Sequence, residues 1–335
     1  MKGQHEVKFY PLTKSNGSWC KKMIQTIAVI GAGTMGHAIA GCFAMYGYTV
    51  RILETFDAVR NDCMNKIRTQ YEFLKKEGMS YPVHIEASLE NIIMCDNMEL
   101  AVTDADYIIE AIPENLELKL QLFDDLDRYA KKEAIFASNT SSLSFESMTA
   151  KLSTERKTRT MICHWYNPAH IMPLVELSFF GNMEEDVYKE VEDMYRKIEK
   201  RPARVRKDIP GLLANRIQQG IAREVFSLIE MGAADPEDID AALKFGPAFR
   251  YATTGQLEVA DFGGLDIWCA VGDNLLSVMD NSTCANPKLR KKVEEGKLGF
   301  KTGQGFFEYP EEKKQEIQEA FNRRLLTQLK ASKNF

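Results

Sequence analysis

The sequence predicts an α/β protein in two parts, a parallel-sheet domain followed by an all-helical domain. Three observations support this. Short apolar segments alternate with helical stretches up to about residue 207. A glycine-rich turn follows the first apolar segment, and beyond residue 208 the pattern becomes almost entirely helical. Strands that alternate with helices of ten or more residues are typical of βαβ units and a parallel sheet.

The expected elements follow from local composition. Strands are expected where short runs are rich in β-branched and aromatic residues, at 25–31, 48–54, 91–96, 107–112, 134–139, 159–165 and 173–179. Helices are expected at 37–47, 57–78, 115–131, 211–231, 235–244, 264–280 and 311–331. Pro210 suits the first turn of a helix, so we place the domain boundary near Lys207. This gives a sheet domain at 1–207, including an N-terminal extension at 1–24, and a helical domain at 208–335.

Composition and charge exclude several classes of protein. A chain of 335 residues with 44% apolar residues and a net charge of -5 is ordinary for a globular protein. No block of basic residues predicts nucleic-acid binding, and no apolar window is long enough to span a membrane. The N-terminus lacks the apolar core of a secretion signal. Seven cysteines are scattered without metal-ligand spacing, which favours a reduced, cytoplasmic protein without a metal site.

The turn "GAGTMG", residues 31–36, predicts a Rossmann-type dinucleotide site. Gly31 permits the tight turn, Gly33 lets the backbone approach a pyrophosphate, and Gly36 lets the helix pack closely on the strand. Thr34 and Met35 lie where the helix begins, and free backbone N–H groups there favour an anion. A glycine-rich turn without a ligand is the alternative.

An acid at the end of the second expected strand indicates which dinucleotide is bound. Glu54 is placed to bind the adenosine ribose hydroxyls and would repel a 2′-phosphate. The next residues, Thr55 and Phe56, offer no cation to receive such a phosphate. The sequence therefore favours NAD over NADP.

Seven segments, spread in order from residue 31 to residue 309, carry a resemblance to a known family. They are "GAGTMG", "EAIPENLELK", "SNTSSL", "HWYNPAHIMPLVEL", "KDIPGLLANRI", "ADPEDIDAALKFG" and "GFKTGQGFFEY". The chain resembles the L-3-hydroxyacyl-CoA dehydrogenase family, including its 3-hydroxybutyryl-CoA dehydrogenases and its lambda-crystallin/L-gulonate and carnitine dehydrogenase branch. The resemblance implies an oxidoreductase of fatty acid metabolism, with a helical second domain that usually forms a homodimer.

The resemblance also implies a catalytic set. His164 matches the family's catalytic histidine and Glu176 the acid that orients it, while Ser141 and Asn215 match residues that contact the substrate oxygen. These types suit the chemistry, because a histidine can accept a hydroxyl proton near neutral pH and a carboxylate can fix its tautomer. The alternatives are a core histidine, a strand-end acid, a helix-capping serine and a packing amide. His170 is a competing histidine, expected in a turn.

Three further positions match residues that the family uses around the nicotinamide end of the cofactor. They are Glu114, Lys119 and Asn167. The alternative for Glu114 and Lys119 is an exposed pair on a helix.

The substrate is the least determined feature. Most matching segments favour a 3-hydroxyacyl-CoA thioester. However, the run at 246–266 is longer than the corresponding acyl-CoA segment and contains Arg250, and the helical stretch after Glu54 is short for a CoA-contacting arm. An arginine fork suits a carboxylate, which makes a free 3-hydroxy acid the second reading. Arg250 equally suits a salt bridge to Glu258 or Asp261. A catalytically silent NAD-binding protein is the third reading.

Overall fold

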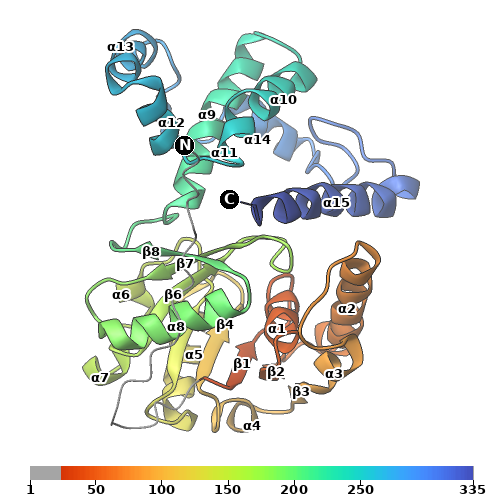
Figure 1. Cartoon of the computed structure of the whole chain (residues 1–335), viewed down its shortest axis with the longest axis vertical. Helices are drawn as coiled ribbons and strands as arrows, with labels where there is room; N and C mark the ends of the chain where they lie inside the picture. Colours follow the sequence, from red (N-terminus) through yellow and green to blue (C-terminus); the bar gives the residue numbers. More distant parts are fainter. Residues whose placement is uncertain (1–23, 335) are drawn as a thin grey trace, which may run out of the picture.

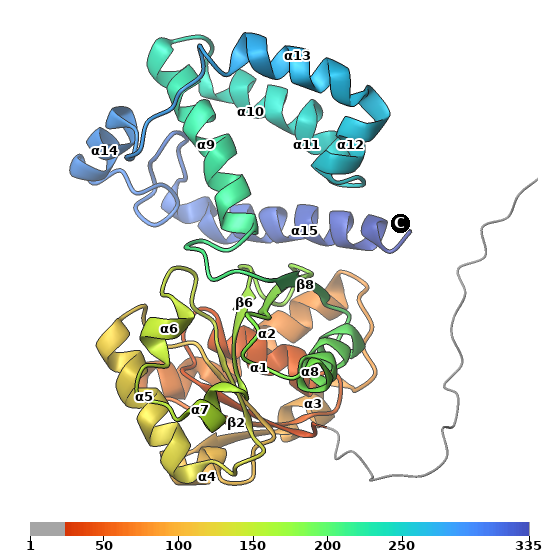
Figure 2. The same ribbon diagram turned by 90° about the vertical axis from the view of Figure 1, so that its left-hand side faces the viewer.

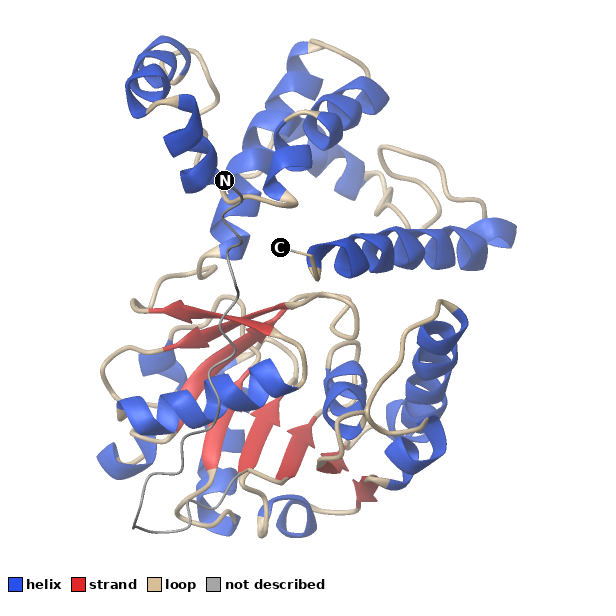
Figure 3. Ribbon diagram, viewed as in Figure 1, coloured by secondary structure: helices blue, strands red, loops and turns tan. Residues whose placement is uncertain are grey.

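The computed structural model describes residues 24–334, so the expected N-terminal extension lies almost wholly outside the described residues. The first domain is built on one eight-stranded sheet (Figures 1 and 3). Its strands are β1 (Thr26–Ile30), β2 (Thr49–Leu53), β3 (Ile92–Cys95), β4 (Tyr107–Glu110), β5 (Ile135–Ser138), β6 (Thr160–Trp165), β7 (Leu174–Ser178) and β8 (Arg201–Val205).

The strand order is β3-β2-β1-β4-β5-β6-β7-β8. All neighbours pair in parallel except β6 and β7, which are antiparallel. The chain reverses direction across the sheet between β1 and β4, and ligands of such sheets bind outside the carboxyl ends of the strands at that point. The fold therefore opens a crevice where the glycine-rich turn leaves β1.

Helices cover both faces of the sheet and bury two apolar clusters (Figure 2). One cluster lies under α1, α2 and α8, and the other under α4, α5 and α6. The helices of this domain are α1 (Gly36–Ala44), α2 (Asp57–Lys76), α3 (Ile85–Glu90), α4 (Met98–Val102), α5 (Leu116–Tyr129), α6 (Phe145–Met148), α7 (Thr154–Lys157) and α8 (Glu185–Lys197).

The second part of the described chain is helical and stands beyond the edge of the sheet where α9 begins (Figures 1 and 2). Its elements are α9 (Ala214–Met231), α10 (Pro236–Phe245), α11 (Pro247–Tyr251), α12 (Gln256–Gly263), α13 (Leu265–Leu275), α14 (Pro287–Glu294), the 3₁₀ turn η1 (Glu311–Lys313) and α15 (Lys314–Ser332). No helix in the described part of the chain is long and apolar enough to cross a membrane.

The terminal helix α15 packs on the first domain, and it is joined to the helical domain by a hydrogen bond from Gln328 Nε2 to the carbonyl oxygen of Ala252 at 3.3 Å. Its Leu326 is 1% exposed and belongs to the apolar cluster of the first domain, with Leu325 and Leu329 beside it. Arg323 pairs with Glu77, just beyond the last residue of α2, at 3.0 Å. The sequence places this helix in the second domain, whereas the structure lays it across α2 of the first (Figure 2).

Two features of the sheet differ from a simple βαβ series. β8 was not among the expected strands, because "RPARV" is charged and begins with an exposed residue. It extends the sheet as a parallel neighbour of β7. The antiparallel pair β6–β7 places His164 directly opposite Glu176 in the register.

Candidate active site

The glycine-rich turn has the shape that a dinucleotide requires. Gly31 has a φ of +93°, and a Cβ there would lie 2.9 Å from the carbonyl oxygen of Ala111. A Cβ on Gly36 would lie 1.8 Å from the carbonyl oxygen of Gly31. By contrast, a Cβ on Gly33 would meet nothing within 4 Å. The backbone at Gly33 is thus open to a ligand, while its neighbours are glycines for steric reasons.

A cavity of about 710 Å³ runs from this turn along the carboxyl ends of β2, β1, β4 and β5. Its lining includes the sequence-predicted residues Gly31, Gly33, Thr34, Met35, Glu54, Glu114 and Ser141. Glu54 is 8% exposed, and its carboxylate accepts hydrogen bonds from the backbone N–H groups of Ala32 at 2.8 Å and Phe56 at 2.9 Å. No lysine or arginine lines the cavity among the described residues, so a 2′-phosphate would meet only Glu54 there.

Glu114 holds the loop that carries Ser141. Its Oε1 accepts hydrogen bonds from the Thr140 hydroxyl at 2.6 Å and from the backbone N–H groups of Ser141 and Ser142, both at 3.0 Å. Burial alone would raise the pKa of Glu114, but these hydrogen bonds and the charge of Lys119 lower it to about 2. Glu114 is therefore an anion at neutral pH, fixed beside the Ser141 loop.

Lys119 lies beneath this loop rather than on the surface. It is 1% exposed, and its ammonium pairs with Glu110 at 2.6 Å and with Glu114 at 3.2 Å. It does not line the large cavity, although the sequence predicts it near the cofactor. Because Lys119 is buried, it cannot form the exposed helical pair with Glu114 that the sequence analysis gave as the alternative. Lys119 contacts the cavity only through Glu114.

His164 and Glu176 form a buried pair on adjacent strands. His164 Nδ1 donates a hydrogen bond to Glu176 Oε2 at 2.8 Å, and Glu176 is 0% exposed. Among the described residues, no hydrogen-bond partner accompanies His164 Nε2. Burial raises the pKa of Glu176, but the bonds from His164 and from two backbone N–H groups outweigh it and lower the pKa. The result is a charged acid that fixes the tautomer of a histidine whose second nitrogen is free.

The two backbone groups that bind Glu176 belong to the start of α9. Leu213 N–H and Ala214 N–H donate to Glu176 Oε1 at 2.8 and 3.0 Å. A carboxylate at a helix N-terminus satisfies N–H groups that have no partner within the helix. The same residue therefore orients the histidine and ties the helical domain to the sheet.

Tyr166 is a residue of this site that the sequence analysis did not identify. Its hydroxyl donates to Asn215 Oδ1 at 2.7 Å, and its ring packs edge-on against that of His164, with centroids 5.5 Å apart. With Tyr166 bound to its amide oxygen, Asn215 has both N–H donors available for another group. The sequence does show a tyrosine two residues after His164, which could have suggested a role in the site. Nothing near it in the sequence indicates that its hydroxyl would contact Asn215 in the second domain.

Ser141 and Asn167 lie on the loops that follow β5 and β6. Asn139, which precedes the Ser141 loop, accepts a hydrogen bond from Trp165 N–H at 2.8 Å. Asn167 begins the turn after β6 and lines a separate cavity of about 490 Å³, together with Thr34. Buried Lys200 holds this turn by donating to the carbonyl oxygens of two of its residues, Ala169 and Met172.

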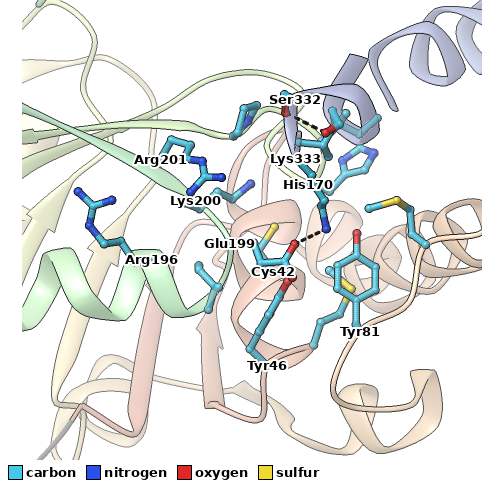
Figure 4. Close-up of a pocket in the computed structure, with 16 residues that line it drawn as sticks. Cys42, Tyr46, Tyr81, His170, Arg196, Glu199, Lys200, Arg201, Ser332 and Lys333 are labelled. Carbon is cyan, nitrogen blue, oxygen red and sulfur yellow. Dashed lines mark hydrogen bonds and ion pairs between the residues drawn. The ribbon is translucent and has the colours of Figure 1, made fainter. Parts of the chain in front are cut away.

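Two residues considered in the sequence analysis, His170 and Arg250, lie outside the group formed by His164, Glu176, Tyr166 and Asn215. His170 lines the cavity that contains Asn167 and the neighbouring one in Figure 4, and its buried Nδ1 has no hydrogen-bond partner. Arg250 is exposed on α11 and lines none of the cavities described above. It forms no ion pair with Glu258 or Asp261. No cluster of three metal-ligating side chains occurs in residues 24–334.

Comparison with known proteins agrees with this arrangement. The 3-hydroxyacyl-CoA dehydrogenase NAD-binding domain matches residues 26–209, and the C-terminal domain of the same family matches residues 211–309. The chain belongs to the 3-hydroxyacyl-CoA dehydrogenase family. It is accordingly an oxidoreductase acting on a CH–OH group, and its cofactor is NAD.

Relatives within this family are named for different substrates. The chain is 30% identical to a 5-formyl-3-hydroxy-2-methylpyridine 4-carboxylate 5-dehydrogenase of Mesorhizobium japonicum, over 91% of this chain and 97% of the relative. It is 33% identical to a probable 3-hydroxybutyryl-CoA dehydrogenase of Bacillus subtilis, over 86% of this chain and 98% of the relative. A solved structure of the pyridine carboxylate enzyme, described as an NAD⁺-dependent dismutase, superposes with a TM-score of 0.84 at 30% identity, covering 91% and 97%.

Proposed function

We propose that the protein oxidises the hydroxyl-bearing carbon of a 3-hydroxyacyl compound, with His164 as the general base. The observation that carries this proposal is the buried pair of His164 and Glu176, 2.8 Å apart on adjacent strands. A histidine whose tautomer is fixed by a carboxylate has one basic nitrogen available, and its ordinary pKa lies near neutrality.

The roles of the protein groups follow from their contacts. Glu176 keeps the proton on Nδ1 of His164, so that Nε2 accepts the hydroxyl proton of the substrate and Glu176 stabilises the imidazolium that forms. Tyr166 holds the amide of Asn215 by its oxygen, which leaves the amide N–H group to donate to the reacting oxygen. The Ser141 hydroxyl is a second donor to that oxygen, on a loop fixed by Glu114.

The cofactor occupies the large cavity in this proposal. Gly33 would hold its pyrophosphate, Glu54 its ribose, and Glu114 would lie toward its nicotinamide end. Asn167 lines the separate cavity that shares Thr34, and only the family resemblance assigns it to the nicotinamide end. NAD, when bound, supplies the hydride acceptor. The intact set of Ser141, His164, Glu176 and Asn215 argues against the catalytically silent reading.

Two substrate classes remain. The family description favours a thioester of coenzyme A. A free carboxylic acid is favoured by the pyridine carboxylate relative, which aligns with more of this chain than the 3-hydroxybutyryl-CoA relative does. Because Arg250 is exposed and lines none of these cavities, its proposed role as the carboxylate ligand has no support from the contacts within one chain.

We further propose a homodimer formed through the helical domain. Neither α9 nor α13 buries a residue. Large apolar side chains of this domain are exposed, among them Ile217 at 67%, Phe262 at 84% and Leu265 at 63%. Exposed apolar surface on this scale marks an interaction site, and a symmetric dimer is the commonest assembly that covers such a face.

The proposed function is tested by a substrate panel and one variant pair. NADH formation is followed with 3-hydroxybutyryl-CoA, L-carnitine and L-gulonate. We expect His164→Ala to lower kcat by about 10²–10⁴, the usual contribution of a general base, with NAD affinity unchanged. His84→Ala removes an exposed histidine outside the site and is the matched control. Near-normal turnover by His164→Ala would exclude this assignment.

A further inference from the structure

His37, the residue that follows the glycine-rich turn, folds back onto the turn. It is the second residue of α1 and is 7% exposed. Its Nδ1 donates a hydrogen bond to the carbonyl oxygen of Gly33 at 2.5 Å. The backbone N–H of His37 reaches the same oxygen only at 3.5 Å, which is longer than an ordinary N–H···O bond. The imidazole is therefore the principal partner of the Gly33 carbonyl.

Gln70 fixes the tautomer of this imidazole. A carbonyl can only accept, so the proton lies on Nδ1 of His37 and Nε2 of the neutral ring is an acceptor. The side-chain Nε2 of Gln70, on α2, donates to it at 2.9 Å. Burial outweighs the bond to Gly33 and lowers the pKa of His37, which keeps the ring neutral at neutral pH. The adjacent Tyr71 docks α2 on α1 by donating to the Gly41 carbonyl oxygen at 2.8 Å.

The bond from His37 sets the direction of the peptide group between Gly33 and Thr34. This peptide is trans, so its carbonyl and its N–H point in opposite directions. The carbonyl faces His37, which lines the cavity of about 490 Å³ and not the large one. The N–H of Thr34 consequently points away from His37. Thr34 itself lines the large cavity as well, where the cofactor is placed.

The N–H groups of the turn are available to a ligand. Those of Gly33, Thr34 and Met35 donate to no backbone carbonyl within residues 24–334, and all three residues line the large cavity. Free N–H groups at the start of a helix bind phosphate groups. A donor that is already aimed contributes more to binding than one that must be ordered when the anion arrives. The direction of the Gly33–Thr34 peptide thus bears on affinity for the cofactor.

We propose that His37 is a positioning residue for NAD. It holds the Gly33–Thr34 peptide so that the N–H of this peptide faces the pyrophosphate, and Gln70 keeps the imidazole in the required tautomer. The inference concerns binding of the cofactor alone and so goes beyond the proposed reaction. It rests on the placement of the pyrophosphate at Gly33 that the proposed function includes.

Two adenine ligands test the proposal without turnover. ADP carries the two phosphate groups, whereas adenosine has the same base and ribose and lacks them. Each displaces NADH from the full chain, and the fluorescence of NADH reports its Kd. His37→Ala should raise the Kd of ADP about tenfold, the order expected when one hydrogen bond to an anion is weakened, and leave that of adenosine within about twofold. An equal loss for both ligands, or a rise below about threefold for ADP, would overturn the proposal.

A conservative variant separates positioning from packing. His37→Asn places an amide nitrogen near the position of Nδ1, so it can still donate to the Gly33 carbonyl although most of the ring is gone. It should bind ADP within about threefold of the parent. ADP binding as weak as that of His37→Ala would show that the ring fills space rather than aiming the peptide.

A variant of Gln70 tests the tautomer. Gln70→Met, at a partly buried position of α2, keeps the length of the side chain and removes the donor to Nε2 of His37. It should raise the Kd of ADP and not that of adenosine, by less than His37→Ala does, because the ring can still donate to Gly33. Unchanged binding of ADP would remove Gln70 from the proposal. Should His37→Ala fail to fold, His37→Asn and Gln70→Met still decide it.

A matched control removes the same kind of contact elsewhere. Ser88, on α3, is 0% exposed and donates to the carbonyl oxygen of His84, four residues before it, at 3.0 Å. It lines neither of the two cavities. Ser88→Ala should therefore lower the melting temperature and leave the Kd of both ligands unchanged. A loss of ADP binding in this variant would mean that general destabilisation explains the effect of His37→Ala.

A variant of the turn tests the placement of the pyrophosphate separately. A Cβ on Gly33 meets no atom within 4 Å, so Gly33→Ala should fold and intrude only on the ligand. ADP should bind it at least about tenfold more weakly. If it does not, the placement of the cofactor fails. If Gly33→Ala weakens ADP binding and His37→Ala does not, the placement holds and the role of His37 fails.

Discussion

Replacing Glu176 by glutamine tests the core of the site with little change in shape. Glu176 accepts three hydrogen bonds, from His164 Nδ1 at 2.8 Å and from the Leu213 and Ala214 N–H groups at 2.8 and 3.0 Å. In Glu176→Gln the amide oxygen can still accept from α9. The amide nitrogen then faces His164, and two donors meet unless the imidazole moves its proton from Nδ1 to Nε2. The nitrogen that should accept the substrate proton would already carry one.

The expected magnitudes follow from these contacts. An amide that imposes the wrong histidine tautomer lowers kcat by about 10⁴ in a serine protease, so we expect about 10³–10⁴ here. Two hydrogen bonds to a charged acceptor become bonds to a neutral one, at about 1 kcal/mol each. The free energy of unfolding should therefore fall by about 2 kcal/mol.

The assay is NADH formation under saturating substrate, with NAD affinity and urea unfolding measured on the same preparations. Glu117→Gln, an exposed acid in the first turn of α5, is the control for loss of an acidic charge near a helix N-terminus. A Glu176→Gln protein with kcat within tenfold of the parent would show that Glu176 does not set the tautomer of His164.

Four further outcomes are expected. Tyr166→Phe should lower kcat roughly 2- to 10-fold through the lost bond to Asn215 with NAD affinity unchanged; a lower melting temperature with normal kcat would mean that Tyr166 only packs. Glu54→Ala should narrow the ratio of kcat/KM for NAD over NADP, and equal efficiencies in the parent protein would show that Glu54 does not face the ribose. Folding lowers the pKa of Glu176. Its ionised carboxylate therefore contributes its full stabilisation above the ordinary glutamate pKa of about 4.3, and this stabilisation is lost as pH falls through the lower folded value. The difference in unfolding free energy between the parent and Glu176→Gln should thus be constant from about pH 8 to 5 and shrink below about pH 4. Light scattering should give about twice the chain mass of 38.1 kDa, and Phe262→Asp should shift it toward the monomer; a parent protein that is already monomeric at micromolar concentration would rule out a tight dimer.

Local patterns were sufficient for seven of the eight strands of the sheet and for the cofactor turn. Gly31 and Gly36 are required by close backbone contacts within their own strand–turn–helix unit, and such contacts are encoded in a short segment. The proximity of His164 and Glu176 was also predicted, but only through the family resemblance. Their direct pairing depends on an antiparallel register, and the apolar pattern around β6 and β7 did not distinguish a parallel from an antiparallel pair.

The remaining contacts join residues far apart in the chain. Tyr166 and Asn215 meet because Glu176 holds the start of α9 over β6. Lys119 looks like an exposed helical residue until β4 brings Glu110 beneath it. Leu326 lies on a helix whose sequence does not indicate which domain it will contact. In each case the second partner comes from an element that local composition cannot place.

In the proposed mechanism, the contacts of Glu176 make catalysis depend on the helical domain being in place. One oxygen of its carboxylate accepts a hydrogen bond from the imidazole of His164 in the sheet domain. The other accepts from the first backbone N–H groups of α9. A sheet domain that folded ahead of the helical domain would already have its glycine-rich turn and could hold NAD. Its acid would lack the amides that keep its charge in place, and its histidine would lack a fixed tautomer. In the proposed mechanism, a chain whose helical domain had not yet joined the sheet domain would bind NAD without being able to reduce it.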